Sequence, residues 1–211
     1  MKACVLWTGG KDSCLAMLTA EEQGWDIAEL VLFVPSGNVG FEAHPLPLIR
    51  AQAESLGLPL RLISIDEPYR DGYVKAFSEM TDVDAVVTGD IDFVDGHPNW
   101  VRECVQDAGG RLQVLTPLWG RDRLGLLRDL VGRGIEARIS YIVHAVIPPT
   151  WLGRKIDDGL IGELRSLQAS YGVDPCGENG EYHTMVEWCP GFTFRVAGVP
   201  AAARTARHAG A

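Results

Sequence analysis

The chain has 211 residues, 46% of them hydrophobic, which is enough for one large domain or for one domain with a smaller appendage. Its formal net charge of −9 makes nucleic acid an unfavoured partner, because proteins that bind tRNA or DNA usually carry clusters of basic residues. Its five cysteines include no Cys-x-x-Cys pair, and no signal pattern or membrane-spanning run is found. We therefore expect a cytoplasmic protein with no disulfide framework, no zinc site and no contact with a membrane.

Apolar runs and helical spacings alternate over the first half of the chain. The apolar runs predict strands at residues 3–7, 27–34, 60–65 and 85–88. The helical spacings predict helices from residue 12 to the turn at Gly24, and at 44–57, 69–80 and 99–108. Near-continuous apolar strands separated by helices are typical of an α/β protein with a doubly wound, Rossmann-like parallel sheet.

The pattern is less regular in the second half. Residues 112–119 are expected to form an extended link, followed by helices at 123–131 and 156–171 and by strands at 137–147 and 192–196. This change suggests three parts: a nucleotide-binding core at 1–120, a smaller C-terminal α+β part at 121–199 that binds substrate at the ligand edge of the core, and a flexible tail at 200–211.

A glycine-containing loop, Thr-Gly-Gly-Lys-Asp-Ser, lies where the first predicted strand gives way to the first predicted helix. Two adjacent glycines allow a sharp turn and a close approach of bare backbone to a ligand. The backbone amides of this turn would converge at the positive end of the helix dipole, and the lysine adds a mobile positive charge. The predicted phosphate-binding residues are Thr8, Gly9, Gly10, Lys11, Asp12 and Ser13.

A second loop, Thr88-Gly89-Asp90, follows the fourth predicted strand. In a doubly wound sheet, ligands lie beyond the carboxyl ends of the strands, where the winding direction reverses. The first and fourth strands are expected to be neighbours at that point, so this loop should face the same crevice as the first one. Asp90 can orient magnesium or a ribose, and we expect any Mg²⁺ to lie near Asp12 or Asp90.

Glycines, acids, an aromatic residue and a histidine are concentrated in residues 174–184, a segment without a hydrophobic face. Such a combination can bind an amine, polarise a carbonyl or hold magnesium through oxygen ligands. Its Glu/His spacing matches no zinc signature. The predicted substrate-binding residues are Gly177, Glu178, Asn179, Gly180, Glu181, Tyr182, His183 and Thr184.

The first loop resembles the Ser-Gly-Gly-Lys-Asp-Ser signature of the PP-loop ATPases. Together with Gly-Glu-Asn-Gly-Glu-Tyr-His-Thr at 177–184, Pro-Leu-Trp-Gly at 117–120 and Trp-Leu-Gly-Arg-x-Ile-Asp at 151–157, it resembles the diphthine–ammonia ligase (diphthamide synthase domain) family. The resemblance runs from about residue 2 to residue 192, and His44 with residues 51–59 fits the second helix of the family. The Asp-Pro-Cys-Gly-Glu-Asn form at 174–179 looks closer to its bacterial-type members.

This resemblance implies a fold of the HUP/PP-loop type, also described as adenine nucleotide alpha-hydrolase-like, and an ATP-dependent ligase that uses ATP and Mg²⁺. A carboxylate on a small molecule or a protein would attack the α phosphate, pyrophosphate would leave, and ammonia or an amine would displace AMP to form an amide. The implied nucleotide-binding residues are those of the two loops together with His44. The implied catalytic residues are Lys11, Asp12, Glu178, Glu181 and His183, and a homodimer is a possible assembly.

Two other functions stay open. One is a PP-loop enzyme that modifies tRNA, with Cys104 and Cys176 as a sulfur-carrying pair, although the acidic charge disfavours it. The other is a protein that binds or senses a nucleotide without turnover, for which the segment 177–184 would be dispensable.

Overall fold

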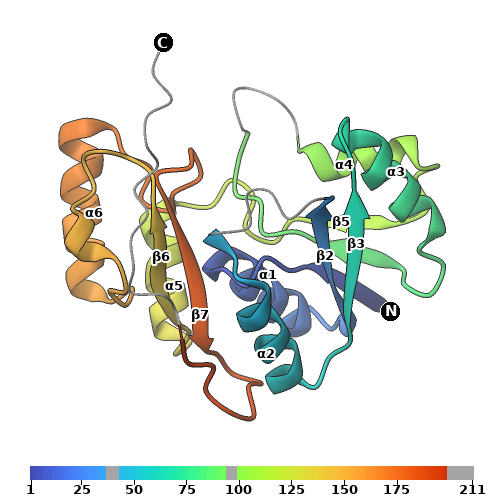
Figure 1. Cartoon of the computed structure of the whole chain (residues 1–211), viewed down its shortest axis with the longest axis horizontal. Helices are drawn as coiled ribbons and strands as arrows, with labels where there is room; N and C mark the ends of the chain where they lie inside the picture. The colour runs from blue at the N-terminus through green and yellow to red at the C-terminus, as the bar shows by residue number, and fades with distance from the viewer. Residues whose placement is uncertain (37–42, 94–98, 199–211) are drawn as a thin grey trace.

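The computed structural model describes residues 1–36, 43–93 and 99–198. At its centre is a five-stranded sheet of order β3-β2-β1-β4-β5, in which every neighbouring pair is parallel (Figure 1). Its strands are β1 (Lys2–Leu6), β2 (Asp26–Pro35), β3 (Leu60–Ile65), β4 (Ala85–Val87) and β5 (Gln113–Leu115). The doubly wound α/β fold is therefore confirmed, and β1 and β4 are neighbours as predicted.

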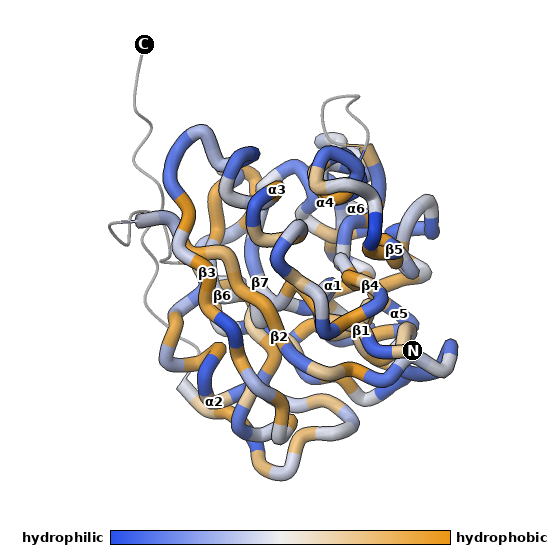
Figure 2. The backbone as a smooth tube through the Cα atoms, turned by 90° about the vertical axis from the view of Figure 1, so that its right-hand side faces the viewer, coloured by the Kyte–Doolittle hydropathy of each residue, from blue (hydrophilic) through white to orange (hydrophobic). Residues whose placement is uncertain are grey.

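Helices cover both faces of this sheet. On one face lie α1 (Lys11–Glu22) and α2 (Leu46–Leu56), and on the other lie α3 (Tyr69–Glu79) and α4 (Trp100–Asp107). Two further helices, α5 (Arg123–Gly132) and α6 (Asp158–Tyr171), pack against each other. Along β1, Ala3 and Val5 pack into one hydrophobic cluster with α1, α2, α5 and α6, while Cys4 packs into a second cluster with α3 and α4. This alternation follows from the pleat, because successive side chains of a strand point to opposite faces. Figure 2 shows the long strand β2 largely in orange, as expected for a strand that is covered on both sides.

A second sheet of two antiparallel strands, β6 (Glu136–Ile142) and β7 (Tyr182–Trp188), lies on the α1 side of the molecule (Figure 1). The amide of Val186 in β7 donates a hydrogen bond of 2.9 Å to the carbonyl of Gly9. Strand β7 therefore reaches the carboxyl end of β1, where the first loop begins.

Three sequence-based expectations are wrong in this second half. Residues 112–119 are not a mere link, because they contain β5, the fifth strand of the sheet. The strand expected at 137–147 ends at Ile142, and His144 lies in the bend that follows. The strand expected at 192–196 does not form. Its backbone is bound instead by α2, where Thr193 donates to the carbonyl of Ser55 at 2.8 Å.

The remaining expectations concern the C-terminal tail, the division of the chain into parts and contact with a membrane. The tail at 200–211 lies outside the described residues, and the division at residue 120 stays a prediction. Within the ranges that the structure describes, no helix is both long and apolar enough to cross a membrane.

Candidate functional site

The loops after β1 and β4 meet at the carboxyl edge of the sheet. A Cβ atom placed on Gly89 would lie 2.7 Å from the carbonyl carbon of Asp12 and 2.8 Å from the amide nitrogen of Ser13. Only glycine allows this approach, because real Cβ atoms do not come within 3.0 Å of such neighbours. Both loops line one cavity of about 310 Å³, so the predicted common crevice is confirmed. Its lining residues are Leu6, Thr8, Asp12, Ser13, Tyr73, Thr88, Gly89, Asp90, Trp100, Val101 and Glu178.

The first loop owes its shape to its two glycines. Gly9 has a φ of +77°, and a Cβ atom there would lie 2.5 Å from Oε1 of Gln52 and 2.8 Å from Cε of Met185. Gly10 is the N-cap residue of α1, with extended backbone angles. The first-turn amides of a helix have no partner within the helix and lie at its positive end, which makes this turn suitable for an anion.

Lys11 is almost completely buried beside this turn, with 3% of its surface exposed. Its Nζ donates to Oδ2 of Asp12 at 2.7 Å and to the carbonyl of Cys176, and it lies 5.4 Å from the centre of the Tyr182 ring. Burial alone would lower the pKa of Lys11, but the Asp12 carboxylate together with Tyr182 and Cys176 raises it above its ordinary value. The lysine is therefore a fixed, charged group rather than a mobile one.

The segment 177–184 forms a second polar cavity of about 240 Å³ against the first loop. Glu178 is the member of this segment that lines both polar cavities. Its Oε2 accepts a bond of 3.4 Å from the amide of Ile91, just after the β4 loop. Burial, followed by the charge of Asp12, raises the pKa of Glu178 to about 7. Near neutral pH this carboxyl can therefore either accept or release a proton.

Other members of the segment build its fold. Glu181 is buried, and its two carboxylate oxygens accept from the amides of Asp174 at 2.7 Å and Asn179 at 3.1 Å. Tyr182 is also buried and donates its hydroxyl to the carbonyl of Pro175 at 2.5 Å. Neither Glu181 nor Asn179 lines the two polar cavities. A direct chemical role for Glu181 stays a prediction, and its contacts favour a role in holding the loop.

Two histidines lie edge to face at the rim of the second cavity. The ring centres of His44 and His183 are 5.2 Å apart, with an interplanar angle of 81°. Burial, and then the neighbouring His183, lowers the pKa of His44 to about 4. Burial, and then the charge of Lys11, also lowers the pKa of His183. Both rings are therefore expected to be uncharged at neutral pH, and each can donate or accept a hydrogen bond.

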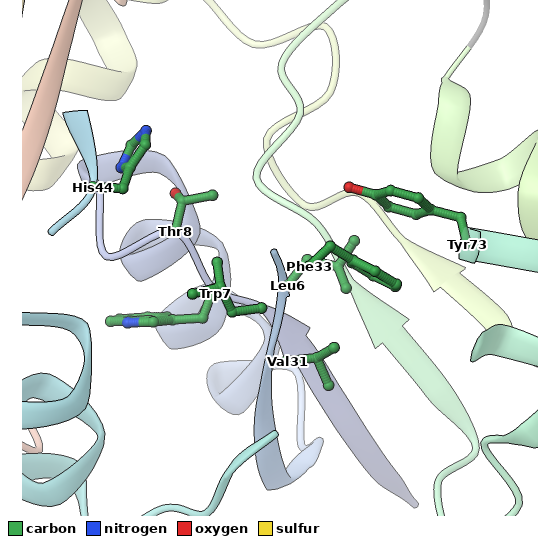
Figure 3. Close-up of a pocket in the computed structure, with 8 residues that line it drawn as sticks. Leu6, Trp7, Thr8, Val31, Phe33, His44 and Tyr73 are labelled. Atoms are coloured by element: carbon green, nitrogen blue, oxygen red, sulfur yellow. The ribbon is translucent and has the colours of Figure 1, made fainter. Parts of the chain in front are cut away.

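An apolar cavity of about 100 Å³ adjoins the polar ones at the ends of β1 and β2 (Figure 3). It is lined by Leu6, Trp7, Thr8, Val31, Leu32, Phe33, His44 and Tyr73. The Phe33 and Tyr73 rings are stacked with their centres 3.8 Å apart. Thr8 lines all three cavities, so they surround one residue at the head of the first loop.

Asp90 extends the negative charge of the site. Its carboxylate accepts from the side-chain amide of Asn99, the N-cap residue of α4, and burial raises its pKa. Among the described residues, no group of three or more His, Cys, Asp or Glu side chains is arranged to hold a metal ion.

Gln52 is a buried residue of this region that the sequence reasoning missed. It accepts from Nε1 of Trp7 at 2.9 Å and donates to the carbonyls of Gly9 at 3.0 Å and Val186 at 2.7 Å. The sequence feature that could have indicated its burial is its position three residues after Ile49, on the apolar stripe of a predicted helix. A polar residue on such a stripe needs buried partners.

The two cysteines proposed as a sulfur-carrying pair lie in different places. Cys176 is buried in the cluster that contains α1, whereas Cys104 is buried in the cluster on the other face of the sheet. Burial raises the pKa of the Cys176 thiol to about 12. The structure therefore does not bring these thiols together.

Two models of a known protein family match this chain. Residues 1–112 match a family model described as the diphthamide synthase N-terminal domain, and residues 122–207 match its C-terminal domain. The chain is similar to the diphthine–ammonia ligase of Danio rerio, with 30% identity over 224 residues that cover 93% of this chain and 86% of the relative.

Two further comparisons concern smaller or more distant similarities. A tRNA-specific 2-thiouridylase of Nitratidesulfovibrio vulgaris is 32% identical over 81 residues, which cover 37% of this chain and 22% of that protein. The crystal structure of a predicted subunit of tRNA methyltransferase from Methanocaldococcus jannaschii superposes with a TM-score of 0.51 at 17% identity, covering 90% of this chain and 98% of that one. The last similarity shows the shared fold alone.

Proposed function

Since this chain belongs to the diphthamide synthase family, we propose that it is an ATP-dependent ligase that joins ammonia or an amine to a substrate carboxylate. The carboxylate is first activated as an acyl-adenylate, with release of pyrophosphate. The observation that supports this proposal best is the convergence of three distant segments, residues 8–13, 88–90 and 177–184, on adjoining cavities around Thr8 and Glu178.

The lining of these cavities supports one proposed orientation of ATP. Its base suits the apolar cavity at the ends of β1 and β2, where Phe33 and Tyr73 offer aromatic surface. Its phosphates suit the first turn of α1, where backbone amides and Lys11 offer positive charge. His44 lines both the apolar and the second polar cavity, which suits a contact at the sugar between base and phosphates.

Magnesium fits the charge of this site. Lys11 is the one cation among the residues that line the two polar cavities in the described part of the chain, whereas three carboxyl groups, those of Asp12, Asp90 and Glu178, line them. A triphosphate would meet net negative charge there unless a cation came with it. Mg²⁺ is usually held by one or two carboxylates together with phosphate oxygens, and Asp12 and Asp90 would hold it here. When bound, it would neutralise charge on the phosphates.

The proposed reaction has two steps. In the first, a carboxylate oxygen of the substrate forms a bond to the α phosphorus, the bond from that phosphorus to the bridging oxygen breaks, and pyrophosphate leaves. Lys11 and the first-turn amides stabilise the charge on the leaving group. In the second, the nitrogen of ammonia or an amine attacks the acyl carbon, AMP leaves, and the nitrogen gives up one proton. Glu178 is the group proposed to accept this proton, because it lines both cavities.

The test is to incubate the protein with ATP, magnesium, ¹⁵N-ammonium and a fractionated extract of carboxylates, and to quantify AMP, ADP and pyrophosphate. We expect AMP and pyrophosphate in equal amounts, together with a ¹⁵N-labelled amide. Formation of ADP would contradict adenylation, and AMP without a labelled amide in any fraction would contradict the use of ammonia. The Lys11→Met variant controls for contaminating ATPases.

A tRNA-modifying function is the second candidate, because the match to a tRNA-specific thiouridylase covers 37% of this chain. It predicts AMP release that depends on tRNA and disappears in Cys104→Ser. The separation of Cys104 and Cys176 and the net charge of −9 weigh against it. A nucleotide sensor, the third possibility, would bind ATP without forming AMP, and Glu178→Gln would leave its ATP binding unchanged.

A further inference from the structure

Gln52 is completely buried, yet all of its side-chain polar atoms have partners of matching chemistry. Its nitrogen faces two acceptors, the carbonyls of Gly9 and Val186, and its oxygen faces one donor, the indole N–H of Trp7. An amide side chain suits this place because it combines two donors with one acceptor group. A carboxylate of the same shape would place an oxygen against the two carbonyls.

These bonds fix the direction of one peptide group in the first loop. The carbonyl of Gly9 is held from inside the protein by Gln52 and by the amide of Val186 at 2.9 Å. A peptide group is planar and trans, so its N–H points away from its C=O. The N–H of Gly10 belongs to the same peptide group as the carbonyl of Gly9, and Gly10 lines the second polar cavity. Holding the carbonyl inward therefore turns the N–H of Gly10 outward, toward that cavity.

We propose that Gln52 is a positioning residue: it orients the Gly10 amide toward a phosphate oxygen and couples the first loop to strand β7, which contains His183 and Thr184. This inference rests on the proposed function only in taking the ligand to be a polyphosphate. The Gln52 nitrogen bonds to the first loop and to β7 at the same time, so neither can move freely without the other. Trp7 is bound to the same side chain and therefore serves as a natural reporter of the loop.

The experiment uses magnesium pyrophosphate as the ligand and the full chain in four forms: wild type, Gln52→Met, Gln52→Glu and Ser55→Ala. Ser55→Ala is the matched control, because Ser55 is also buried in α2 and also binds the C-terminal segment, through the carbonyl of Phe194 at 2.6 Å. The amides of the first loop and the indole N–H of Trp7 are followed by ¹⁵N NMR, with Trp7→Phe identifying the indole signal. Thermal unfolding measures folding separately.

We expect wild type and Ser55→Ala to bind pyrophosphate equally well and to shift both the loop amides and the Trp7 indole signal. Gln52→Met should weaken binding about tenfold, the effect of one to two lost hydrogen bonds, and its indole signal should no longer respond. Gln52→Glu should weaken binding further while keeping a folded spectrum.

The outcomes are distinguishable. If pyrophosphate shifts the loop amides in wild type but Gln52→Met binds equally well, the positioning role is refuted while the proposed phosphate site stands. If pyrophosphate shifts no loop amide in wild type, the proposed phosphate site itself fails. If Ser55→Ala weakens binding as much as Gln52→Met, the effect comes from general loss of packing and the positioning role is again refuted.

Discussion

The backbone amide of Lys11 donates a hydrogen bond of 3.1 Å to Oγ1 of Thr184, which lies 173 positions further along the chain. The side chain of Lys11 reaches the same region through the carbonyl of Cys176. The glycine loop after β1 is thus completed by the C-terminal segment in addition to the bonds within the loop itself. This closure explains why a lysine that looks mobile in the sequence is buried and fixed.

Replacing Lys11 by Met should weaken ATP binding by roughly tenfold to 100-fold, because one charged hydrogen-bond donor to phosphate is removed while most of the buried stem is kept. Isothermal titration with ATP and magnesium measures this change. Lys75→Met, which changes an exposed lysine of α3, is the control and should bind normally. Unchanged affinity in Lys11→Met would exclude this turn as the phosphate site.

The reaction rate should depend on the ionisation of Glu178. Because its pKa is raised to about 7, kcat/KM at a constant concentration of free ammonia should rise about tenfold per pH unit below 7 and level off above it. This direction follows because only the ionised carboxylate can take the proton. In Glu178→Gln the rate should be low and the rise should be absent. A wild-type profile that is flat from pH 6 to pH 8 would argue against Glu178 as the base.

The same carboxyl should destabilise the folded protein at high pH. Its pKa is raised above the ordinary value of 4.5, so the folded state holds this proton more tightly than the unfolded state. The free energy of unfolding therefore falls between pH 4.5 and pH 7. At pH 8, the free energy of unfolding of Glu178→Gln should therefore be about 1–3 kcal/mol higher than that of wild type, and its Tm should be higher as well. At pH 4.5 the two Tm values should be nearly the same. Thermal unfolding at the two pH values checks this without any substrate.

Glu181→Gln should loosen the loop that Glu181 binds. An amide side chain can accept from only one of the two backbone amides of Asp174 and Asn179, so we expect a loss of about 1–3 kcal/mol and faster hydrogen exchange in residues 174–181. Glu163→Gln, in a largely exposed pair with Arg154, should cost far less. An inactive Glu181→Gln with unchanged Tm and exchange would instead indicate a direct chemical role.

Gly89→Ala should disturb the start of α1, because the new Cβ atom would lie 2.7 Å from the backbone of Asp12. We expect a loss of about 1–3 kcal/mol together with weaker ATP binding. Gly162→Ala is the control, since it lies inside α6 with no atom within 4 Å of the added Cβ, and it should be neutral or slightly stabilising. Equal Tm and ATP affinity in both variants would contradict the close contact.

The sheet and its two loops were predictable because they depend on local pattern. Apolar runs and helical stripes alternate over the first half of the chain, and the carboxyl edge of such a sheet is a fixed consequence of its topology. Strand β5 was missed because it begins with a polar residue, Gln113, and so lacks the unbroken apolar run that indicates the equally short β4. The strand expected at 192–196 shows alternating Phe192, Phe194 and Val196. Its backbone bonds to Ser55 in α2 and through one amide, that of Val196, to Glu187 in β7, which does not make it a strand.

The buried polar contacts of the site could not be predicted from the sequence pattern. Strand β7 begins inside a motif rich in glycine and acids, which has the composition of a loop. Thr184 and Gln52 are buried only because partners far away in the sequence satisfy them. A single sequence gives the residue types of such a network, but the pairing of donors and acceptors depends on the complete fold.

The contact between the glycine loop and β7 also bears on protein synthesis. Residues 8–13 leave the ribosome well before Thr184 and Val186, which hold that loop through hydrogen bonds to Lys11 and Gly9. A nascent chain is therefore expected to bind nucleotide only after Thr184 and Val186 have left the ribosome, although the sheet that frames the loop can fold earlier.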